Sequence, residues 1–397
     1  MPPRYFPLDR PHSDLLDTAV RALKHTRTEV LRLLDSGSGL SRPTYAAPGG
    51  DTKQMLSIDQ VAEEKCRSYL VNHIGDRVVR VLGEETLWHP EFKTLDLSRQ
   101  HLEGYGEKVD GTKVRLVDGA EERLVVIVDM IDGSDLVERN FGNWCSAMIF
   151  FKRSANRPEI WFSMVHNADG TIYGADAVGT FLIRPTSKKG EAFPSLNGPD
   201  IRKLYQSTPR DPKNPKKEPP IEETRQIAIC FYGQKPSHFS TIPPGFQIWT
   251  KRSAASDRLR IYNLAGNPMM VRLANGENIH AVFEHKGQFA HDASPGAYIG
   301  LQAGAHLVDL AGKKIEVLDL ARTLLTPSVS SVRYVLACTE ELALELAAAL
   351  RATTKAYYRC SDCEAGVVAE RSSYPPNCSH CNKPMIENER RGISATT

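Results

Sequence analysis

The chain of 397 residues lacks several features that would point to particular classes of protein. Its charge is nearly balanced, with 50 Lys and Arg against 48 Asp and Glu, so no global field attracts nucleic acid or an anionic membrane. No apolar run approaches the ~20 residues that a spanning helix needs, and the first residues lack the apolar core of a signal peptide. No internal repeat is visible. We therefore expect a globular protein with no membrane partner, long enough for one large domain or two smaller ones.

Cysteine is also scarce, with eight in the whole chain. Four of them are scattered and lie mostly beside apolar residues, which predicts buried thiols rather than disulfides: Cys66, Cys145, Cys230 and Cys338. Free thiols are typical of a reducing compartment, so we expect a cytoplasmic protein.

The pattern of apolar residues predicts an α/β fold. Apolar residues recur at helical spacing over 13–36, where Gly37 ends the pattern, and again over 58–74. An Ala/Leu-rich segment over 342–350 predicts a further helix. Strands are predicted near 124–129, 146–152, 160–165, 171–175, 180–183 and 226–232.

Two polar segments interrupt this alternation. Residues 86–120 show no clear periodicity and are either a loop over a functional site or a surface excursion. Residues 185–223 are rich in Pro and Lys and too polar to pack, which favours a solvated insertion over a site for polyanions.

The most informative segment is Asp129-Met130-Ile131-Asp132-Gly133-Ser134-Asp135, which follows a buried apolar strand. Carboxylates that converge on one point, such as Asp129 and Asp132, repel each other unless a cation lies between them. Hard oxygen ligands of this kind suit Mg²⁺. The alternative is an ordinary Asx/Gly turn after a strand.

Two distant segments favour the metal site over the turn. The strand that includes Val81 leads into Gly83-Glu84-Glu85, and Asp292 precedes an apolar stretch with helical character, where an acid near the N-terminus is favoured electrostatically. Three acidic clusters at the ends of strands or helices are what a two- or three-metal phosphoryl-transfer site requires.

In this ordered set of motifs the chain resembles the inositol monophosphatase-like family of Mg²⁺-dependent, Li⁺-sensitive phosphatases. The family pattern is Gly-Glu-Glu, then Asp-Pro-Ile-Asp-Gly-Thr/Ser, then Trp-Asp-x-Ala-Ala-Gly, and each has a counterpart here. The resemblance covers roughly residues 13 to 350. It implies a layered α-β-α-β-α sandwich, a domain over 1–350, hydrolysis of a phosphate monoester, and a homodimer as a possible assembly.

The resemblance also implies roles for individual residues. The metal ligands would be Glu84, Asp129, the backbone carbonyl of Ile131, Asp132 and Asp292, which together hold two or three Mg²⁺ ions. The catalytic residues would be Asp59, Ser134 and Glu84, with Ser134 and Asp59 as the dyad that orients and deprotonates the attacking water. The substrate would contact Gly133, Ser134, Asn267 and Glu284.

Several departures from the family pattern bear on these roles. Met130 stands where Pro is usual and His291 where Trp is usual. The family's Arg followed by Gly-Ser-Ala-Ala has no clean match, so the substrate is the weakest inference. Asp135 either binds a further ion or caps a helix beginning at Leu136, and we favour the cap. Glu63 shares a helix face with Asp59 and has either a functional or a surface role.

The last part of the chain, residues 351–397, has a different pattern. It contains C-x₂-C-x₁₄-C-x₂-C, close to the spacing of a zinc ribbon with four Cys ligands: Cys360, Cys363, Cys378 and Cys381. A closed site of this kind is structural, and it would fold a segment too small to hold a core alone. His380, between two of the ligands, is expected at the surface. Docking or oligomerisation is favoured over nucleic-acid binding for this module.

The sequence therefore predicts two alternative functions. The leading one is Mg²⁺-dependent hydrolysis of a small phosphate monoester. An inositol or sugar phosphate is preferred because Glu284 resembles the acid that contacts a polyol hydroxyl, and a 3′-phosphorylated nucleotide is the alternative. Adenine recognition would predict an aromatic or apolar slot. The other function is a non-catalytic binding or regulatory protein that uses the ribbon for nucleic acid or protein contact.

Overall fold

The structure is a computed structural model of the chain. It describes residues 5–6, 10–38, 44–46, 52–54, 57–74, 78–83, 105–107, 113–115, 124–138, 142–152, 158–186, 227–231, 246, 259–264, 266–277, 279–325, 332–351, 355–360, 362–363, 366–370, 377–383 and 385–387.

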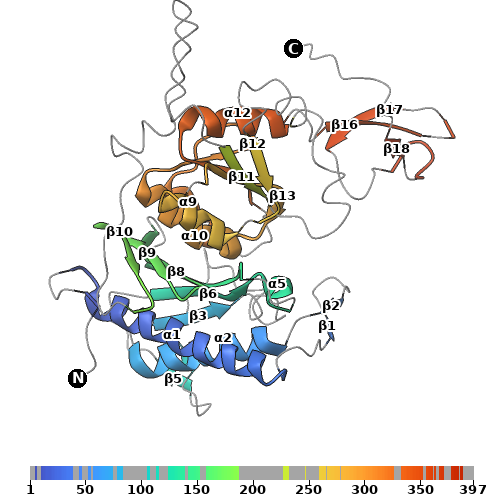
Figure 1. Ribbon diagram of the computed structural model, residues 1–397. Coiled ribbons are helices and arrows are strands. Elements are labelled where there is room, and N and C mark those ends of the chain that lie inside the picture. Colours follow the sequence, from blue (N-terminus) through green and yellow to red (C-terminus); the bar gives the residue numbers. More distant parts are fainter. Residues whose placement is uncertain are drawn as a thin grey trace, which may run out of the picture.

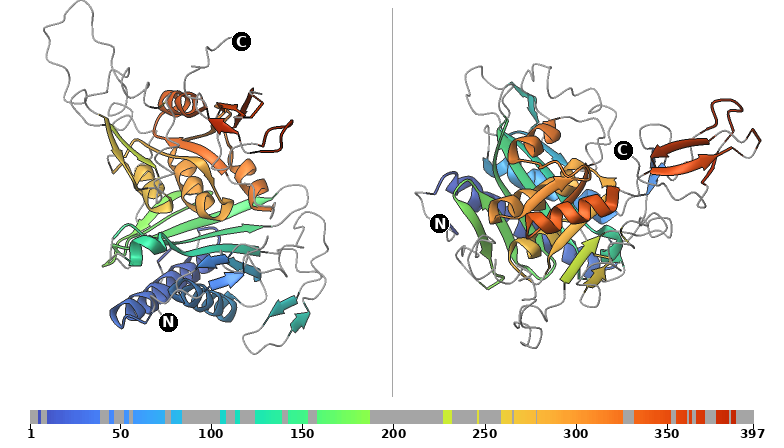
Figure 2. Two further views of the ribbon diagram at one scale, coloured as in Figure 1. Left: turned by 90° about the vertical axis from the view of Figure 1, so that its right-hand side faces the viewer. Right: turned by 90° about the horizontal axis from the view of Figure 1, so that it is seen from above.

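The main body has five layers of alternating helices and sheets (Figures 1 and 2). Helices α1 (Ser13–Asp35) and α2 (Ser57–Ile74) form the first layer. Helices α9 (Asn267–Ala274), α10 (Ala290–Ala303) and α11 (Val317–Leu325) form the third layer, between two sheets. Helix α12 (Glu340–Arg351) covers the far sheet. This is the layered α/β sandwich that the sequence predicts.

The second layer is a six-stranded sheet in the order β10-β9-β8-β7-β6-β3. At one end of this order, β3 (Val78–Gly83) and β6 (Leu124–Asp132) pair in parallel. The remaining pairs are antiparallel, through β7 (Cys145–Lys152), β8 (Glu159–Asn167), β9 (Ile172–Asp176) and β10 (Gly179–Ile183).

This sheet is apolar on both faces because helices cover both. Along β6, Val125 and Ile127 pack into the core between the sheets, whereas Val126 and Val128 pack into the core under α1 and α2. A strand buried on both faces is a continuous apolar run, as Leu124–Val128 is in the sequence.

The fourth layer is a five-stranded sheet in the order β12-β11-β13-β15-β14. Strand β11 (Ile227–Phe231) pairs in parallel with both β12 (Leu259–Tyr262) and β13 (Ala281–Gln288). The antiparallel pairs on the other side involve β14 (His306–Asp309) and β15 (Val332–Ala337).

The remaining elements are short. Helix α5 (Ser134–Glu138) follows β6 directly. Two hairpins pair β1 (Thr44–Ala46) with β2 (Thr52–Gln54) and β4 (Tyr105–Glu107) with β5 (Lys113–Arg115). Near the C-terminal end, β16 (Lys355–Arg359) pairs with β17 (Gly366–Glu370) and with β18 (Ile386–Glu387).

The helices and strands named from the sequence are confirmed within a few residues, and α11, β12 and β14 were not predicted. All eight cysteines are free, and the four scattered ones are buried, as expected. The insertion at 185–223 and most of 86–120 lie outside the described residues, and the boundary near residue 350 stays a prediction. No described helix is long and apolar enough to cross a membrane.

Candidate active site

The end of β3 lies beside the start of the acidic segment of β6. Strands β3 and β6 run parallel, and Gly83 at the end of β3 pairs with Val128, one residue before Asp129. The carboxyl ends of parallel strands lie at the same edge of a sheet, so Gly83 lies at the same edge as Asp129. Glu84, the predicted ligand that follows Gly83, lies outside the described residues.

Asp129 continues the face of β6 that points to α9 and α10. Its carboxylate is 4% exposed, and its partner across the ladder is Ala147, whose small side chain leaves room beside it. A register shift between the pairs Asp129–Ala147 and Asp132–Cys145 puts a bulge at Met130 and Ile131. A bulge at a strand end re-aims the residues that follow it.

The Asp132 carboxylate reaches across to the start of α9. Its Oδ2 accepts a hydrogen bond of 2.8 Å from the backbone N–H of Asn267, the first residue of that helix. A carboxylate there is favoured by the helix dipole. The preceding residue must be Gly266: its φ is +76°, and a Cβ atom would lie 2.7 Å from Asp132 Oδ2. Asp132 therefore ties the two halves of the sandwich together.

A tight turn follows Asp132 and opens helix α5. Gly133 has a φ of +97°, and a Cβ there would lie 3.2 Å from the carbonyl oxygen of Asn143. The Gly133 carbonyl accepts hydrogen bonds from the backbone N–H groups of Leu136 and Val137. Ser134 is the first residue of the helix and is half-buried.

The prediction that Asp135 is the N-cap of a helix starting at Leu136 is wrong. The helix starts two residues earlier, at Ser134, so position 135 lies inside its first turn. The cause is Gly133, whose positive φ ends the strand at once and whose carbonyl accepts the first helical hydrogen bonds.

Helix α2 presents an acidic face to the end of β3. Asp59 lies in the first turn and is half-buried, and Glu63 is 5% exposed on the same face one turn later. A Cβ on Gly83 would overlap the Glu63 carboxyl group, so the glycine of Gly-Glu-Glu is required by this contact. Arg67 pairs with Glu63 at 3.0 Å.

Asp292 lies in the first turn of α10, as predicted. The start of this helix is fixed to α9, because Asn267 Oδ1 accepts a hydrogen bond of 2.7 Å from the backbone N–H of Gly296. Pro295 lies inside the helix, and its carbonyl accepts a hydrogen bond from the Ser163 hydroxyl in β8. Asn267 is thus a fully buried bridge between two helix starts.

The negative charges of these acids act on the same neighbouring side chains. Burial raises the pKa of the Tyr334 hydroxyl well above its ordinary value, and the neighbouring charges of Glu284, Asp132 and Asp292 raise it further. Burial also raises the pKa of the Cys145 thiol, and Asp132 and Asp129 add to that shift. Asp132 and Asp129 are therefore both near the Cys145 thiol, and Asp132 and Asp292 are both near the Tyr334 hydroxyl.

This arrangement fits a hard divalent cation. Its donors are the carboxylates of Asp129 and Asp132 at the end of β6 and of Asp292 in α10, and oxygen donors are those that Mg²⁺ takes. Among the described residues, however, the four-cysteine cluster is the group of side chains that lie close enough together to share one ion, and Asp129, Asp132 and Asp292 do not form such a group.

Glu284 is positioned differently from the expectation. It is 4% exposed, and its Oε1 accepts hydrogen bonds from the backbone N–H groups of Lys286 at 2.7 Å and Gly287 at 3.2 Å. Burial raises the pKa of its carboxyl group, which the charge of Lys286 and these hydrogen bonds oppose. The visible contacts of this carboxylate stabilise the bulge in β13, and contact with a polyol stays a prediction.

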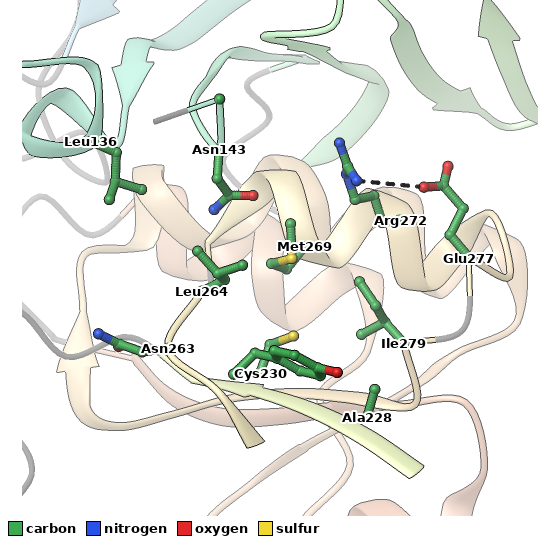
Figure 3. A pocket seen from close by; sticks show the side chains of 12 residues that line it. Leu136, Asn143, Ala228, Cys230, Asn263, Leu264, Met269, Arg272, Glu277 and Ile279 are labelled. Atoms are coloured by element: carbon green, nitrogen blue, oxygen red, sulfur yellow. Dashed lines mark ion pairs between the residues drawn. The ribbon is translucent and has the colours of Figure 1, made fainter. Parts of the chain in front are cut away.

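A pocket of about 700 Å³ lies beside the turn at Gly133 (Figure 3). It lies between α5, the residues before β7, the start of β11 and the helix α9. Its lining includes the side chains of Leu136, Asn143, Leu264, Met269, Arg272 and Ile279.

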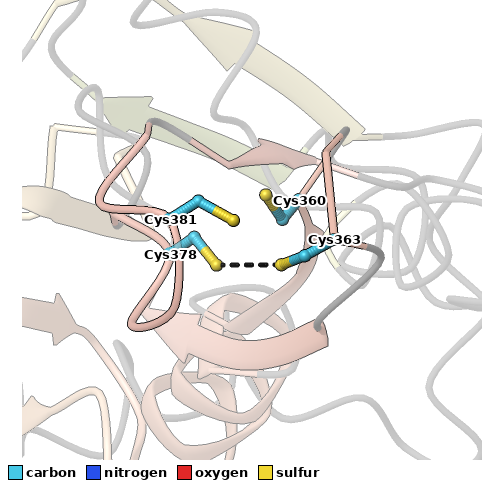
Figure 4. A group of neighbouring side chains, drawn as sticks. All are labelled: Cys360, Cys363, Cys378 and Cys381. Atoms are coloured by element: carbon cyan, nitrogen blue, oxygen red, sulfur yellow. Dashed lines mark hydrogen bonds between the residues drawn. The ribbon is translucent and has the colours of Figure 1, made fainter.

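The four predicted zinc ligands converge (Figure 4). The Sγ atoms of Cys360, Cys363, Cys378 and Cys381 all lie within 4.8 Å of one another. Hydrogen bonds from the backbone N–H groups of Cys381 and His380 lower the pKa of the Cys378 thiol. The pKa of the Cys381 thiol is raised, chiefly by its hydrogen bond with the Cys363 thiol. A cluster that already favours one thiolate fits a thiophilic metal. His380 is exposed, as expected.

Comparisons with known proteins agree on the architecture. The Thermotoga maritima inositol monophosphatase superposes with a TM-score of 0.51 at 13% identity, covering 85% of this chain and 98% of that chain. SaIMPase-II, from Staphylococcus aureus, in its structure with 2′-AMP bound, superposes with a TM-score of 0.51 at 14% identity. The match covers 85% of this chain and 96% of that chain. The structure of the same enzyme with inositol monophosphate bound superposes with a TM-score of 0.50 at 15% identity. The match covers 85% of this chain and 97% of that chain.

The chain has the inositol monophosphatase fold. No protein-family model matches the sequence, and no curated protein matches it either. At such low identity the superposition establishes the fold, and the chemistry has to be argued from the residues of this chain.

Sequence reasoning missed four features that shape the site. They are the approach of Gly266 to Asp132, the Cys145 thiol beside Asp132, the contact of Glu63 with Gly83, and the buried Tyr334. The one signal available was the pair Gly266-Asn267 directly before a helical pattern with Pro at its second position, which is typical of a helix start.

Proposed function

We propose that this chain is a Mg²⁺-dependent phosphatase that hydrolyses a small phosphate monoester. The proposal is supported above all by the register of β3 and β6, which pairs Gly83, the last described residue before Glu84, with Val128, the residue before Asp129. Asp132 at the start of α9 and Asp292 in the first turn of α10 add carboxylates at the same end of the sheet. Acids that are far apart in the sequence would not converge on one strand end in an ordinary Asx turn.

Each residue has a role in this proposal. Asp129, Asp132, Asp292 and Glu84, with the Ile131 carbonyl, hold the metal, which when bound neutralises phosphate charge and lowers the pKa of water. Ser134 donates its hydroxyl hydrogen to Asp59 and accepts a proton from the attacking water with its lone pair. The backbone at Gly133 and the start of α5 approach the phosphate, since N–H groups at a helix start attract anions.

Positioning accounts for most of the rate in this kind of reaction, because phosphoryl transfer leaves little covalent work for the protein. The hydrogen bond from Asn267 orients Asp132, and the buried bridge from Asn267 to Gly296 sets the start of α10 relative to it. One residue, Asn267, therefore links the Asp132 carboxylate to the first turns of the helix that carries Asp292.

Two classes of substrate fit this chemistry. An inositol or sugar phosphate is the first, and a nucleotide with a 2′- or 3′-phosphate is the second. Structures of SaIMPase-II with inositol monophosphate and with 2′-AMP indicate that one fold accommodates both kinds of ligand.

The test is release of inorganic phosphate from a panel of polyol and nucleotide monophosphates, with and without added Mg²⁺. Asp132→Asn should abolish most of the activity, because the amide can neither supply a charged ligand nor accept as strongly from Asn267. Asp319→Asn, in the unrelated helix α11, is the matched control and should behave as wild type. Metal-independent activity, or full activity of Asp132→Asn, would reject the proposal.

We also propose that the four-cysteine cluster holds one structural Zn²⁺ ion. Four converging thiols support this, and so do the few buried apolar residues among the described residues around them, since metal binding then supplies folding energy. With eight free cysteines the protein belongs in a reducing compartment, and we place it in the cytoplasm.

A further inference from the structure

The backbone between Asp129 and Asp132 leaves the regular ladder. Three steps along β6, from Asp129 to Asp132, correspond to two steps along β7, from Ala147 to Cys145. One extra residue is therefore held in β6, which is the definition of a bulge. Ser146 is the single residue of β7 between these two pairs, so it lies opposite the bulge.

Ser146 closes the bulge with a side-chain hydrogen bond. Its hydroxyl donates to the carbonyl oxygen of Met130 at 2.7 Å, and both groups are buried. A buried carbonyl that a bulge removes from the regular ladder needs another donor. The Met130 carbonyl belongs to the middle one of the three planar peptides between Asp129 and Asp132. Fixing this plane restrains the Ile131 carbonyl next to it and the two carboxylates on either side.

Ser146 is a polar side chain on an apolar face. It is 0% exposed, and a hydroxyl buried in an apolar layer is costly unless it is hydrogen-bonded. The neighbouring residues of β6 and β7 that pack into the core under α1 and α2 are apolar: Val128, Met130, Met148 and Phe150. The core therefore gives no reason for a hydroxyl at this position, whereas the Met130 carbonyl does.

The residue at position 130 explains why the bulge needs a restraint. Proline, which is usual here in the family pattern, has a φ fixed at about −65° and restrains the backbone by itself. Met130 has no such ring. A proline would fit the site, because prolines within strands occur at bulges and Asp129 before it is in a strand, the conformation that a residue before proline prefers. Ser146 thus supplies from the neighbouring strand the restraint that a proline ring would supply.

We propose that Ser146 is a positioning residue for the metal site, because its hydrogen bond fixes the bulge that sets the spacing of the ligands. The inference rests on the proposed function and extends it to a residue outside the ligand set. Ser146 lies on the face of the sheet opposite to the Asp129 carboxylate, since β6 and β7 alternate between the two cores. It therefore acts through the Met130 backbone and not on the metal or the substrate.

The test measures binding of Mn²⁺ to the full-length, zinc-loaded protein without substrate, by electron paramagnetic resonance of the free ion. Ser146→Ala should weaken binding at least about tenfold, a loss typical of removing a group that orients a metal ligand. The matched control is Ile183→Val, because Ile183 is also fully buried in the core under α1 and α2 but lies in β10, at the opposite edge of the sheet. It should cost similar stability and bind Mn²⁺ within about twofold of wild type.

Met130→Pro separates positioning from simple destabilisation. The single variant should bind Mn²⁺ within about threefold of wild type, because the ring restrains the bulge. In the double variant with Ser146→Ala, binding should return to the level of Met130→Pro alone. If the two losses of affinity multiply instead, the restraint is not what Ser146 supplies and the inference is overturned. If Met130→Pro does not fold, the comparison of Ser146→Ala with Ile183→Val decides alone.

Asp132→Asn distinguishes failure of this inference from failure of the proposed function. If wild type binds Mn²⁺, Asp132→Asn does not, and Ser146→Ala binds as tightly as wild type, the metal site stands and the role of Ser146 is overturned. If Asp132→Asn binds Mn²⁺ like wild type, the ion is held elsewhere and the proposed function fails.

Discussion

Replacing Gly266 by Ala tests whether the approach of Asp132 to α9 organises the site. Gly266 has φ +76° and ψ −167°, a region that is almost restricted to glycine. A Cβ there would lie 2.7 Å from Asp132 Oδ2 and 3.0 Å from Oδ1. In Gly266→Ala the Asp132 carboxylate must therefore move. Its hydrogen bond of 2.8 Å from the backbone N–H of Asn267 is then lost.

Two costs add in this variant. The backbone strain amounts to about 1–3 kcal/mol, and loss of a hydrogen bond to a charged acceptor costs about 1.5–3 kcal/mol. We expect the free energy of unfolding to fall by about 3–5 kcal/mol, a large part of the ~5–15 kcal/mol typical of a folded protein. Activity should fall by at least about 100-fold in the fraction that stays folded, because a catalytic ligand displaced by 1 Å has an effect of that order.

Urea unfolding followed by circular dichroism gives the stability, and phosphate release under native conditions gives the activity. The control is Gly37→Ala, because Gly37 also has a positive φ, +68°, but a Cβ added there would have no other atom within 4 Å. It should cost about 1–2 kcal/mol and leave kcat unchanged. If Gly266→Ala resembles Gly37→Ala in both measurements, the collision with Asp132 is irrelevant and the reasoning is refuted.

Other contacts lead to three further predictions. Gly83→Ala should destabilise the protein because its side chain meets the Glu63 carboxyl, and adding Glu63→Ala should recover part of that loss in urea unfolding; no recovery would mean that the contact is not the cause. Burial lowers the pKa of His166 to about 4, so the folded protein resists its protonation. The unfolded chain takes up that proton as pH falls below ~6.5, and stability should drop by about 3 kcal/mol by pH 4. His166→Gln should flatten this dependence in unfolding measured across that pH range, and an unchanged slope would argue against it. Cys360→Ser should reduce bound zinc well below the one ion per chain expected from elemental analysis of wild type, whereas His380→Ala should keep it; equal zinc in both variants would exclude the four-cysteine site.

The sequence was sufficient for those parts of the site that depend on local pattern. The apolar run over Leu124–Val128 is continuous because β6 is buried on both faces, so the strand and the acids at its end could be predicted. Asp292 was placed at a helix start for a similar reason. The cysteine spacing predicted a cluster because two knuckles of fixed length bring their thiols together.

The contacts between layers could not be predicted in this way. The requirement for glycine at position 266 arises from Asp132, which lies 134 residues earlier in the chain. The charges of Asp132 and Asp292 act on the Tyr334 hydroxyl only because β15 packs against α10. The pocket needs α5, α9 and β11 together. Local periodicity carries no information about such distances, and the helix start at Ser134 was missed because the role of Gly133 depends on its φ.

The most direct test of the central claim is a crystal structure of the wild-type protein soaked with Mn²⁺ and phosphate, in which anomalous scattering locates the metal. The claim is that the acids at the end of β6 and in the first turn of α10 form one metal site. We predict an anomalous peak within coordination distance of Asp129, Asp132 and Asp292, with phosphate at the turn of Gly133. Metal bound only at other acids, or phosphate bound away from this turn, would contradict the account.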